Sequence, residues 1–64
     1  MIDARGLRCP WPALRLARAL RQGGEGAAFE VLADDPNAER EMRAVAEAAG
    51  RQLMRLEEHR FEVR

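Results

Sequence analysis

Apolar residues recur at helical spacing in two stretches of the chain. The first stretch, expected to begin at Pro10 and to end in the glycine-rich segment 23–26, has an apolar stripe made of Ala13, Leu16, Ala17 and Leu20. The second, expected to begin at Pro36 after an Asp35 N-cap and to end at Gly50, has a stripe made of Ala38, Met42, Val45, Ala46 and Ala49. Residues spaced by three or four share one face of a helix, proline suits the first helical position, and glycine suits the residue after the last. Each stretch therefore predicts a helix with one buried face.

Shorter apolar runs and alternating patterns predict strands in the rest of the chain. These strands fall at residues 2–4, 27–33, 52–57 and 60–63. In the second of them Phe29, Val31 and Ala33 should face the same way, since successive residues of a strand point to opposite sides. A tight turn near Glu58 and His59 should join the last two strands.

The predicted order of elements is βαβαββ, in a single domain that covers residues 1–64. Because each helix has one apolar stripe, both helices should cover the same face of a four-stranded mixed sheet. The expected fold class is therefore α/β, a two-layer sandwich whose core includes Met42 and Met54. The opposite face of the sheet should carry charged residues, among them Glu30, Arg60 and Glu62, and contact solvent or a partner.

Composition narrows the classes of function that fit this fold. The 11 basic residues, all of them arginine, and the 11 acidic residues cancel to a formal charge of +0. Such a chain lacks the broad basic footprint of a free-standing nucleic-acid binder, so direct binding of nucleic acid is not expected. A metal site is not expected either, because the chain has one cysteine and one histidine, whereas zinc usually takes three or four protein ligands.

The cysteine count also indicates the compartment. A single cysteine, Cys9, cannot form an internal disulfide, and a free thiol is typical of a reducing compartment. The sequence shows neither the apolar run of about 18 residues that a membrane helix needs nor a secretory signal pattern. We therefore expect a cytoplasmic protein that does not enter the membrane.

Cys9 is the candidate for chemistry because it stands just before the first predicted helix. Unpaired N–H groups and the helix dipole favour an anion at that end, so we expect the pKa of Cys9 to be lowered and its thiolate to be nucleophilic. Arg5 and Arg8 in the preceding turn could add positive charge, while Pro10 and Pro12 stiffen the turn. The other interpretation is a small buried hydrophobe, which is how many lone cysteines behave.

Two segments resemble a known family. The first is residues 2–12, IDARGLRCPWP, whose centre is a Cys-Pro-x-Pro motif after a short strand and a glycine turn. The second is Asp34-Asp35-Pro36 at the start of the second helix. At this spacing, and with the βαβαββ order, the chain resembles the TusA (SirA-like) sulfur-carrier family over essentially its whole length. The residue between the two prolines is often acidic in that family, and here it is Trp11.

The resemblance implies a sulfur carrier of the sulfurtransferase class. Cys9 would accept sulfane sulfur as a persulfide from a donor, often a cysteine desulfurase or a rhodanese, and pass it to an acceptor protein. Pro10 and Pro12 would shape the turn that presents the sulfur, with Asp34 and Asp35 near it. No cofactor is implied beyond the covalent persulfide sulfur, and we expect a monomer that forms transient complexes. Family members feed tRNA thiolation, molybdenum-cofactor enzymes or sulfur oxidation.

Trp11 falls on a helical wheel with Arg15 and Arg18, away from the apolar stripe. This position predicts a partly exposed tryptophan beside the reactive sulfur. Tryptophan and arginine are enriched at interface hot spots, so Trp11, Arg15 and Arg18 are candidate partner-binding residues. The alternative is that Trp11 folds back over the edge of the core.

Competing functions predict different behaviour of Cys9. A carrier needs one thiol and no second one nearby, because a second thiol would discharge the persulfide as a disulfide, and one cysteine fits that need. In a regulatory or protein-binding module, or in a thiol redox sensor, Cys9→Ser would leave function intact or abolish only a redox response. RNA binding through the arginines is the weakest alternative and predicts a strongly salt-dependent affinity.

Overall fold

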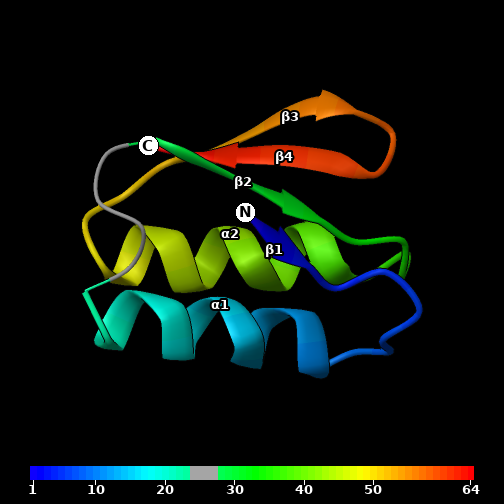
Figure 1. Cartoon of the computed structure of the whole chain (residues 1–64), viewed down its shortest axis with the longest axis horizontal. Coiled ribbons are helices and arrows are strands. Elements are labelled where there is room, and N and C mark those ends of the chain that lie inside the picture. The colour runs from blue at the N-terminus through cyan, green and yellow to red at the C-terminus, as the bar shows by residue number, and fades with distance from the viewer. Residues whose placement is uncertain (24–27) are drawn as a thin grey trace.

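The computed structural model describes residues 1–23 and 28–64. The described residues form two helices and four strands in the predicted βαβαββ order: β1 (Ile2–Asp3), α1 (Trp11–Arg21), β2 (Phe29–Leu32), α2 (Ala38–Ala48), β3 (Leu53–Glu57) and β4 (Arg60–Val63). The strands make one mixed sheet and both helices lie on the same side of it (Figure 1). The predicted two-layer α/β sandwich is therefore confirmed. Part of the glycine-rich segment and the first residue of the predicted second strand lie outside the described residues.

The strand order in the sheet is β1-β2-β4-β3. β1 runs parallel to β2, while β4 pairs antiparallel with both β2 and β3. Val31 lies at the centre of this arrangement, opposite Ile2 on one side and Phe61 on the other. Phe29, Val31 and Ala33 are all buried, as the alternation predicted, and they point toward the helices.

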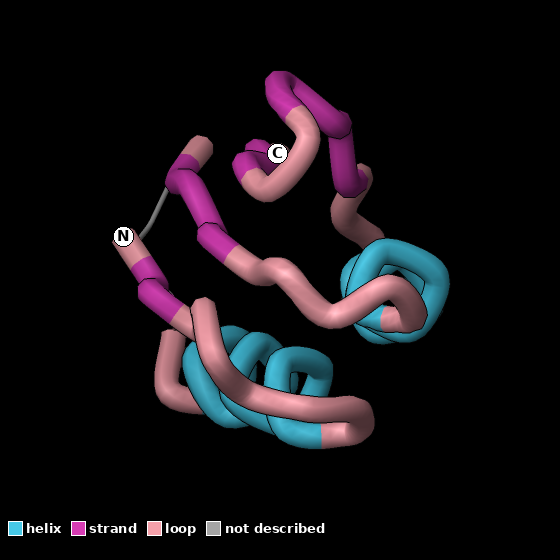
Figure 2. The backbone as a smooth tube through the Cα atoms, turned by 90° about the vertical axis from the view of Figure 1, so that its right-hand side faces the viewer, coloured by secondary structure: helices cyan, strands magenta, loops and turns pink. Residues whose placement is uncertain are grey.

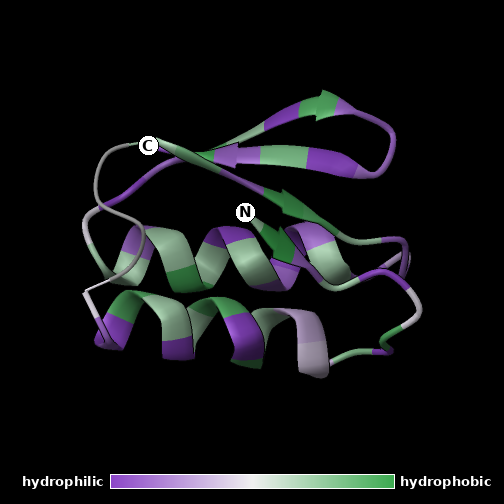
Figure 3. Cartoon of the chain, in the orientation of Figure 1, coloured by the Kyte–Doolittle hydropathy of each residue, from purple (hydrophilic) through white to green (hydrophobic). Residues whose placement is uncertain are grey.

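Each helix buries one stripe against the sheet. Pro12, Ala13 and Leu16 are buried in α1, and the buried residues of α2 are Ala38, Met42 and Ala46. The helices run in the same direction, so that both begin at the same end of the molecule (Figure 1). Figure 2 looks from that end and shows the sheet curving over the two helices. Apolar and hydrophilic residues alternate along each helix in Figure 3, as expected for one buried and one exposed face.

Several element boundaries differ from the sequence prediction: β1 and β2 each end one residue early, β3 begins one residue late, and both helices begin later than expected. Helix α1 begins at Trp11, with Pro10 as its N-cap. Helix α2 begins at Ala38, two residues later than predicted, and its N-cap is Asn37 instead of Asp35. The carboxylate of Asp35 accepts a hydrogen bond from the Asn37 N–H at 2.8 Å, which forms a local turn ahead of the helix. Aspartate side chains can bind backbone N–H groups that a helix would otherwise leave unpaired. Here Asp35 forms such a turn, and the helix begins after it.

The end of α2 agrees with the sequence prediction, whereas the exposure of one residue of β3 does not. Gly50 follows the Ala49 C-cap with a φ of 73°, a conformation in which glycine carries no Cβ penalty, so the predicted stop is confirmed. Met54 is 40% exposed, so its predicted place in the core was wrong. Leu53 is the buried residue at that end of β3. Within the described ranges neither helix has the length and apolar composition needed to cross a membrane.

Candidate functional site

Cys9 lies in the turn that connects β1 to α1, and backbone hydrogen bonds hold this turn against the sheet. The Ala4 N–H donates to the Leu32 carbonyl at 2.7 Å, and the Leu7 N–H donates to the Ala4 carbonyl at 3.3 Å. Leu7 packs against the core. Gly6 has a φ of 81°, which permits the reversal between these contacts at a position where other residues would be strained. The turn therefore presents Cys9 from a fixed base, with the thiol partly exposed.

One hydrogen bond joins the two segments that carried the family resemblance. The Gly6 N–H donates to a carboxylate oxygen of Asp34 at 2.9 Å. Asp34 thus holds the cysteine-bearing turn to the loop before α2. Asp35, the next residue, lies close enough for its negative charge to act on Cys9. The structure therefore brings the Asp34–Asp35 pair to the same end of the molecule as the thiol.

The thiol itself contacts a residue that the sequence reasoning did not single out. Sγ of Cys9 lies 2.7 Å from Oε1 and 2.7 Å from Oε2 of Glu41, in the first turn of α2. This hydrogen bond to Glu41 is the main cause of a raised pKa of Cys9. Desolvation and the negative charges of Glu41 and Asp35 act in the same direction, and Arg40 acts against them. The predicted lowering of this pKa was therefore wrong.

The N-terminal end of α1 does little to stabilise a thiolate at Cys9, and this is why the pKa of Cys9 is not lowered. Cys9 stands two residues ahead of the first helical residue, and dipole effects fade beyond the terminal turn. Pro10 and Pro12 have no N–H, and the Trp11 N–H donates to the Arg8 carbonyl at 2.8 Å. The donors nearest to Cys9 are thus missing or already used.

Arg5 and Arg8 do not act as predicted either. Arg5 donates from Nε at 3.0 Å and from Nη2 at 2.8 Å to the two carboxylate oxygens of Asp3. This pairing lowers the pKa of Asp3 to about 2. Arg8 is exposed, and the cation that lowers the pKa of Cys9 is Arg40. Neither predicted arginine therefore supplies the charge that acts on the thiol.

The prolines of the motif have different environments. Pro10 is exposed at the N-cap position of α1, whereas Pro12 is fully buried under the first turn. Burial of Pro12 anchors the start of the helix in the core. Cys9 and Trp11 come shortly before this anchor in the chain, and Cys9 is partly exposed while Trp11 is exposed.

Glu41 could have been suspected from its helical position. It lies three residues after Ala38 and four before Val45, so it borders the apolar stripe instead of the solvent face. Its contact with a residue 32 positions earlier could not be read from this spacing. The carboxylate of Glu41 reaches the thiol of Cys9 because α2 packs beside the turn that carries Cys9.

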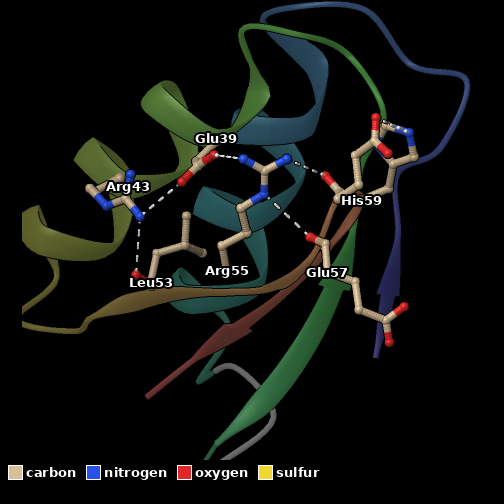
Figure 4. Close-up of polar contacts among 7 residues, drawn as sticks. Glu39, Arg43, Leu53, Arg55, Glu57 and His59 are labelled. Carbon is tan, nitrogen blue, oxygen red and sulfur yellow. Dashed lines mark hydrogen bonds and ion pairs between the residues drawn. The ribbon is translucent and has the colours of Figure 1, made fainter.

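A salt-bridge network attaches the start of α2 to the sheet (Figure 4). Glu39 pairs with Arg43 at 3.1 Å, as the i,i+4 spacing allows, and with Arg55 of β3 at 3.5 Å. Arg43 also donates to the Leu53 carbonyl at 3.4 Å, and Arg55 donates to the carbonyl of Glu57 at 3.4 Å. Each pair contributes only about 0–1 kcal/mol, so the network adds modestly to the packing that holds the helix turn carrying Glu41.

Trp11, Arg15 and Arg18 line a groove between α1 and β1. The open space is about 560 Å³, and Met1 and Leu14 contribute apolar walls. Trp11 is 58% exposed, so it does not fold back over the core. Helix α1 carries no acidic residue, and the side chains of Arg15 and Arg18 have no ion-pair partner in the described part of the chain. The groove thus combines apolar walls with Arg15, Arg18 and Asp3, and its Trp11 lies two residues along the chain from Cys9.

Comparison with known proteins gives the family. The family model described as "Sulfurtransferase TusA" matches residues 1–64. The chain belongs to the TusA family. It is similar to "Sulfur carrier protein TusA" of Allochromatium vinosum, with 37% identity over 57 residues that cover 89% of this chain and 75% of the relative. It is also similar to "Putative sulfur carrier protein" of Archaeoglobus fulgidus, with 36% identity over 56 residues that cover 88% of this chain and 73% of the relative.

The TusA match includes every residue of the candidate site. The match spans both segments that carried the resemblance, and the Gly6–Asp34 hydrogen bond joins those segments in space. Among the described residues no group of three or more histidine, cysteine, aspartate or glutamate side chains is arranged to hold a metal ion. In this TusA-family chain the candidate site brings the Cys9 thiol together with the Glu41 carboxylate.

Proposed function

We propose that this TusA-family protein is a sulfur carrier that holds sulfane sulfur as a persulfide on Cys9 and relays it between two other proteins. The observation that supports this most is the position of the chain's single cysteine, partly exposed on a turn tied down at both ends. A fixed turn at the molecular edge lets a partner cysteine approach the sulfur. A second thiol that could discharge the persulfide is absent from the chain.

The chemistry of the relay is an exchange without net oxidation. Sγ of Cys9 attacks the outer sulfur of a donor persulfide, a new S–S bond forms, and the donor cysteine leaves as a thiol. We propose a cysteine desulfurase or a rhodanese as donor, and an acceptor protein in tRNA thiolation, molybdenum-cofactor or sulfur-oxidation pathways. A carrier that works with a free thiol belongs in a reducing compartment, so the cytoplasm is the proposed location.

The groove lined by Trp11, Arg15 and Arg18 favours docking of a partner protein whose contact surface carries acidic residues. Trp11 supplies an exposed aromatic anchor, and Arg15 and Arg18 supply positive charge, although the charge of Arg15 also acts on Asp3 in the same groove. Complementary charge raises the rate of encounter, and a tryptophan anchor that enters a pocket contributes affinity. Docking here would bring a partner to the end of α1 that follows the cysteine-bearing turn.

The raised pKa of Cys9 disfavours a redox sensor. Sensor cysteines are typically exposed thiols of low pKa, because the thiolate reacts with oxidants. Glu41 instead favours the neutral thiol. The sensor alternative therefore lacks the acidic thiol that it requires, whereas the carrier has in Glu41 a carboxylate within reach of the thiol proton.

Sulfur loading tests the proposed function. Incubation with a cysteine desulfurase and cysteine, or with a rhodanese and thiosulfate, should add the mass of one sulfur atom to the intact protein. A reductant should remove it, and Cys9→Ser should show no gain. If the wild type gains no sulfur from either donor system while the thiol is intact, the carrier proposal fails.

Trp11→Ala tests the docking groove. We expect it to weaken binding to the loading desulfurase about tenfold or more, as loss of a hot-spot tryptophan does. Unfolding free energy should change by less than about 0.5 kcal/mol because Trp11 is 58% exposed. Leu56→Ala is the matched control, since Leu56 is also exposed but lies on β3. Equal losses of affinity in both variants would argue against the groove.

A further inference from the structure

Glu41 stands apart from its neighbours in what it contacts. Glu39, two residues earlier, is held by Arg43 and Arg55. Glu41 has no arginine partner in the described ranges, and both of its carboxylate oxygens lie 2.7 Å from Sγ of Cys9. It is half-buried, as is the thiol. A carboxylate within hydrogen-bond reach of a nucleophile is the arrangement by which a neighbouring base takes the nucleophile's proton.

We propose that Glu41 is the proton-transfer residue of Cys9. Its carboxylate takes the thiol proton as Sγ attacks the outer sulfur of a donor persulfide, and it then gives that proton to the departing sulfur of the donor. This inference rests on the proposed carrier function and adds a second catalytic residue to it.

The step balances in atoms and electrons. Sγ of Cys9 forms a bond to the sulfane sulfur, the S–S bond of the donor breaks, and its electron pair stays on the donor cysteine sulfur. The proton passes from Sγ to a carboxylate oxygen of Glu41 and from there to the donor sulfur. One persulfide and one thiol enter, one persulfide and one thiol leave, and neither an oxidant nor a reductant is consumed.

The same contact distinguishes the empty carrier from the loaded one. In the empty state the thiol donates to Glu41, and the charges that act on it are those of Glu41, Asp35 and Arg40. A persulfide is more acidic than a thiol, so the loaded group carries negative charge and no longer donates to the carboxylate. Repulsion between like charges then directs the outer sulfur away from Glu41, toward an approaching partner.

Two reactions of Cys9 distinguish proton transfer by Glu41 from a mere effect of Glu41 on the pKa of the thiol. Alkylation by iodoacetamide releases iodide, which needs no proton, so its rate reports the thiolate population. Sulfur uptake from glutathione persulfide releases a thiolate that does need one. Both rates can be followed by intact mass for the wild type, Glu41→Gln and the matched control Glu47→Gln, whose residue is exposed on the same helix. Circular dichroism checks that each variant folds.

We expect the two rates of Glu41→Gln to move in opposite directions. Removal of the negative charge should speed alkylation near neutral pH by about 3–10-fold, because the thiolate becomes more abundant. Loss of the proton carrier should slow sulfur uptake about tenfold or more below the wild-type rate, because a general acid–base effect of about 10²–10⁴-fold outweighs the gain in thiolate. Glu47→Gln should change neither rate, and Glu41→Asp should restore part of the uptake.

The outcomes keep the two proposals apart. If Glu41→Gln takes up sulfur faster in proportion to its faster alkylation, Glu41 only sets the acidity of the thiol, and the proton-transfer role is overturned while the carrier function stands. An unchanged uptake rate in Glu41→Gln also overturns that role. If the wild type alkylates but accepts sulfur neither from glutathione persulfide nor from the protein donors, the carrier function fails and the role of Glu41 fails with it.

Discussion

Leu16→Ala is expected to lower the free energy of unfolding by about 2–5 kcal/mol. Leu16 is fully buried on the sheet-facing side of α1, so truncation removes apolar contacts and leaves a cavity. A domain of 64 residues has a total stability of only about 3–10 kcal/mol, and this one change therefore removes a large share of it. Urea denaturation followed by far-UV circular dichroism measures the loss.

Leu14→Ala is the matched control for that change. Leu14 lies on the same helix but is 48% exposed, so its truncation should cost less than about 0.5 kcal/mol. Equal destabilisation by the two variants would mean that α1 turns a different face to the sheet. A small effect of Leu16→Ala alone would mean that the helix contributes little to the core.

Alkylation of Cys9 is expected to accelerate about tenfold per pH unit from about pH 7 to about pH 9, with no plateau in that range. Only the thiolate reacts, and the contact with Glu41 raises the pKa of Cys9 above its ordinary value. The rate should be measured with iodoacetamide on the folded protein and on the same chain in urea. The unfolded chain should level off at the lower pH, since it lacks Glu41 as a neighbour. A plateau of the folded protein below the plateau of the unfolded chain would show a stabilised thiolate instead.

The raised pKa of Cys9 in the folded state also determines how the free energy of unfolding depends on pH. As pH rises, the unfolded state loses the thiol proton first, because the pKa of Cys9 is higher in the folded state. The stability that comes from the protonated thiol is therefore fully present below the unfolded-state pKa and is lost as pH rises through the folded-state pKa. The urea midpoint of the wild type should fall over this alkaline range more than that of Cys9→Ser.

The order of elements and most of the buried stripe of each helix were predictable from sequence because they rest on local periodicity. The placement of Ala49 in the stripe of the second helix was wrong, since Ala49 is the exposed C-cap of α2. Ala13 and Leu16 recur at helical spacing, and Phe29 and Val31 alternate, so each pattern identifies its own element and its buried side. Gly50 ends α2 for an equally local reason, since its φ of 73° suits glycine. The Cys-Pro-x-Pro segment and the family were likewise recognisable without coordinates.

Where local signals competed, neighbouring elements decided the outcome. In β3 the run of Leu53, Met54, Arg55 and Leu56 is compatible with either face of a strand. Antiparallel pairing of Leu53 with Val63 turns Leu53 inward and leaves Met54 exposed. Asp35 offered a good helix cap, yet its side chain holds the Asn37 N–H in a turn and α2 starts later.

The electrostatic environment of Cys9 was determined only by the tertiary structure. From sequence, the adjacent helix end and Arg5 predicted a lowered pKa, because both are close along the chain. In the folded protein Arg5 is paired with Asp3, and Glu41 reaches the thiol from 32 residues away. Electrostatic energy depends on distance through space and on solvent exposure, and neither follows from separation along the chain. The sequence alone thus determined which thiol is the candidate nucleophile and which fold carries it, and the packing of α2 beside the cysteine turn decided how acidic that thiol is.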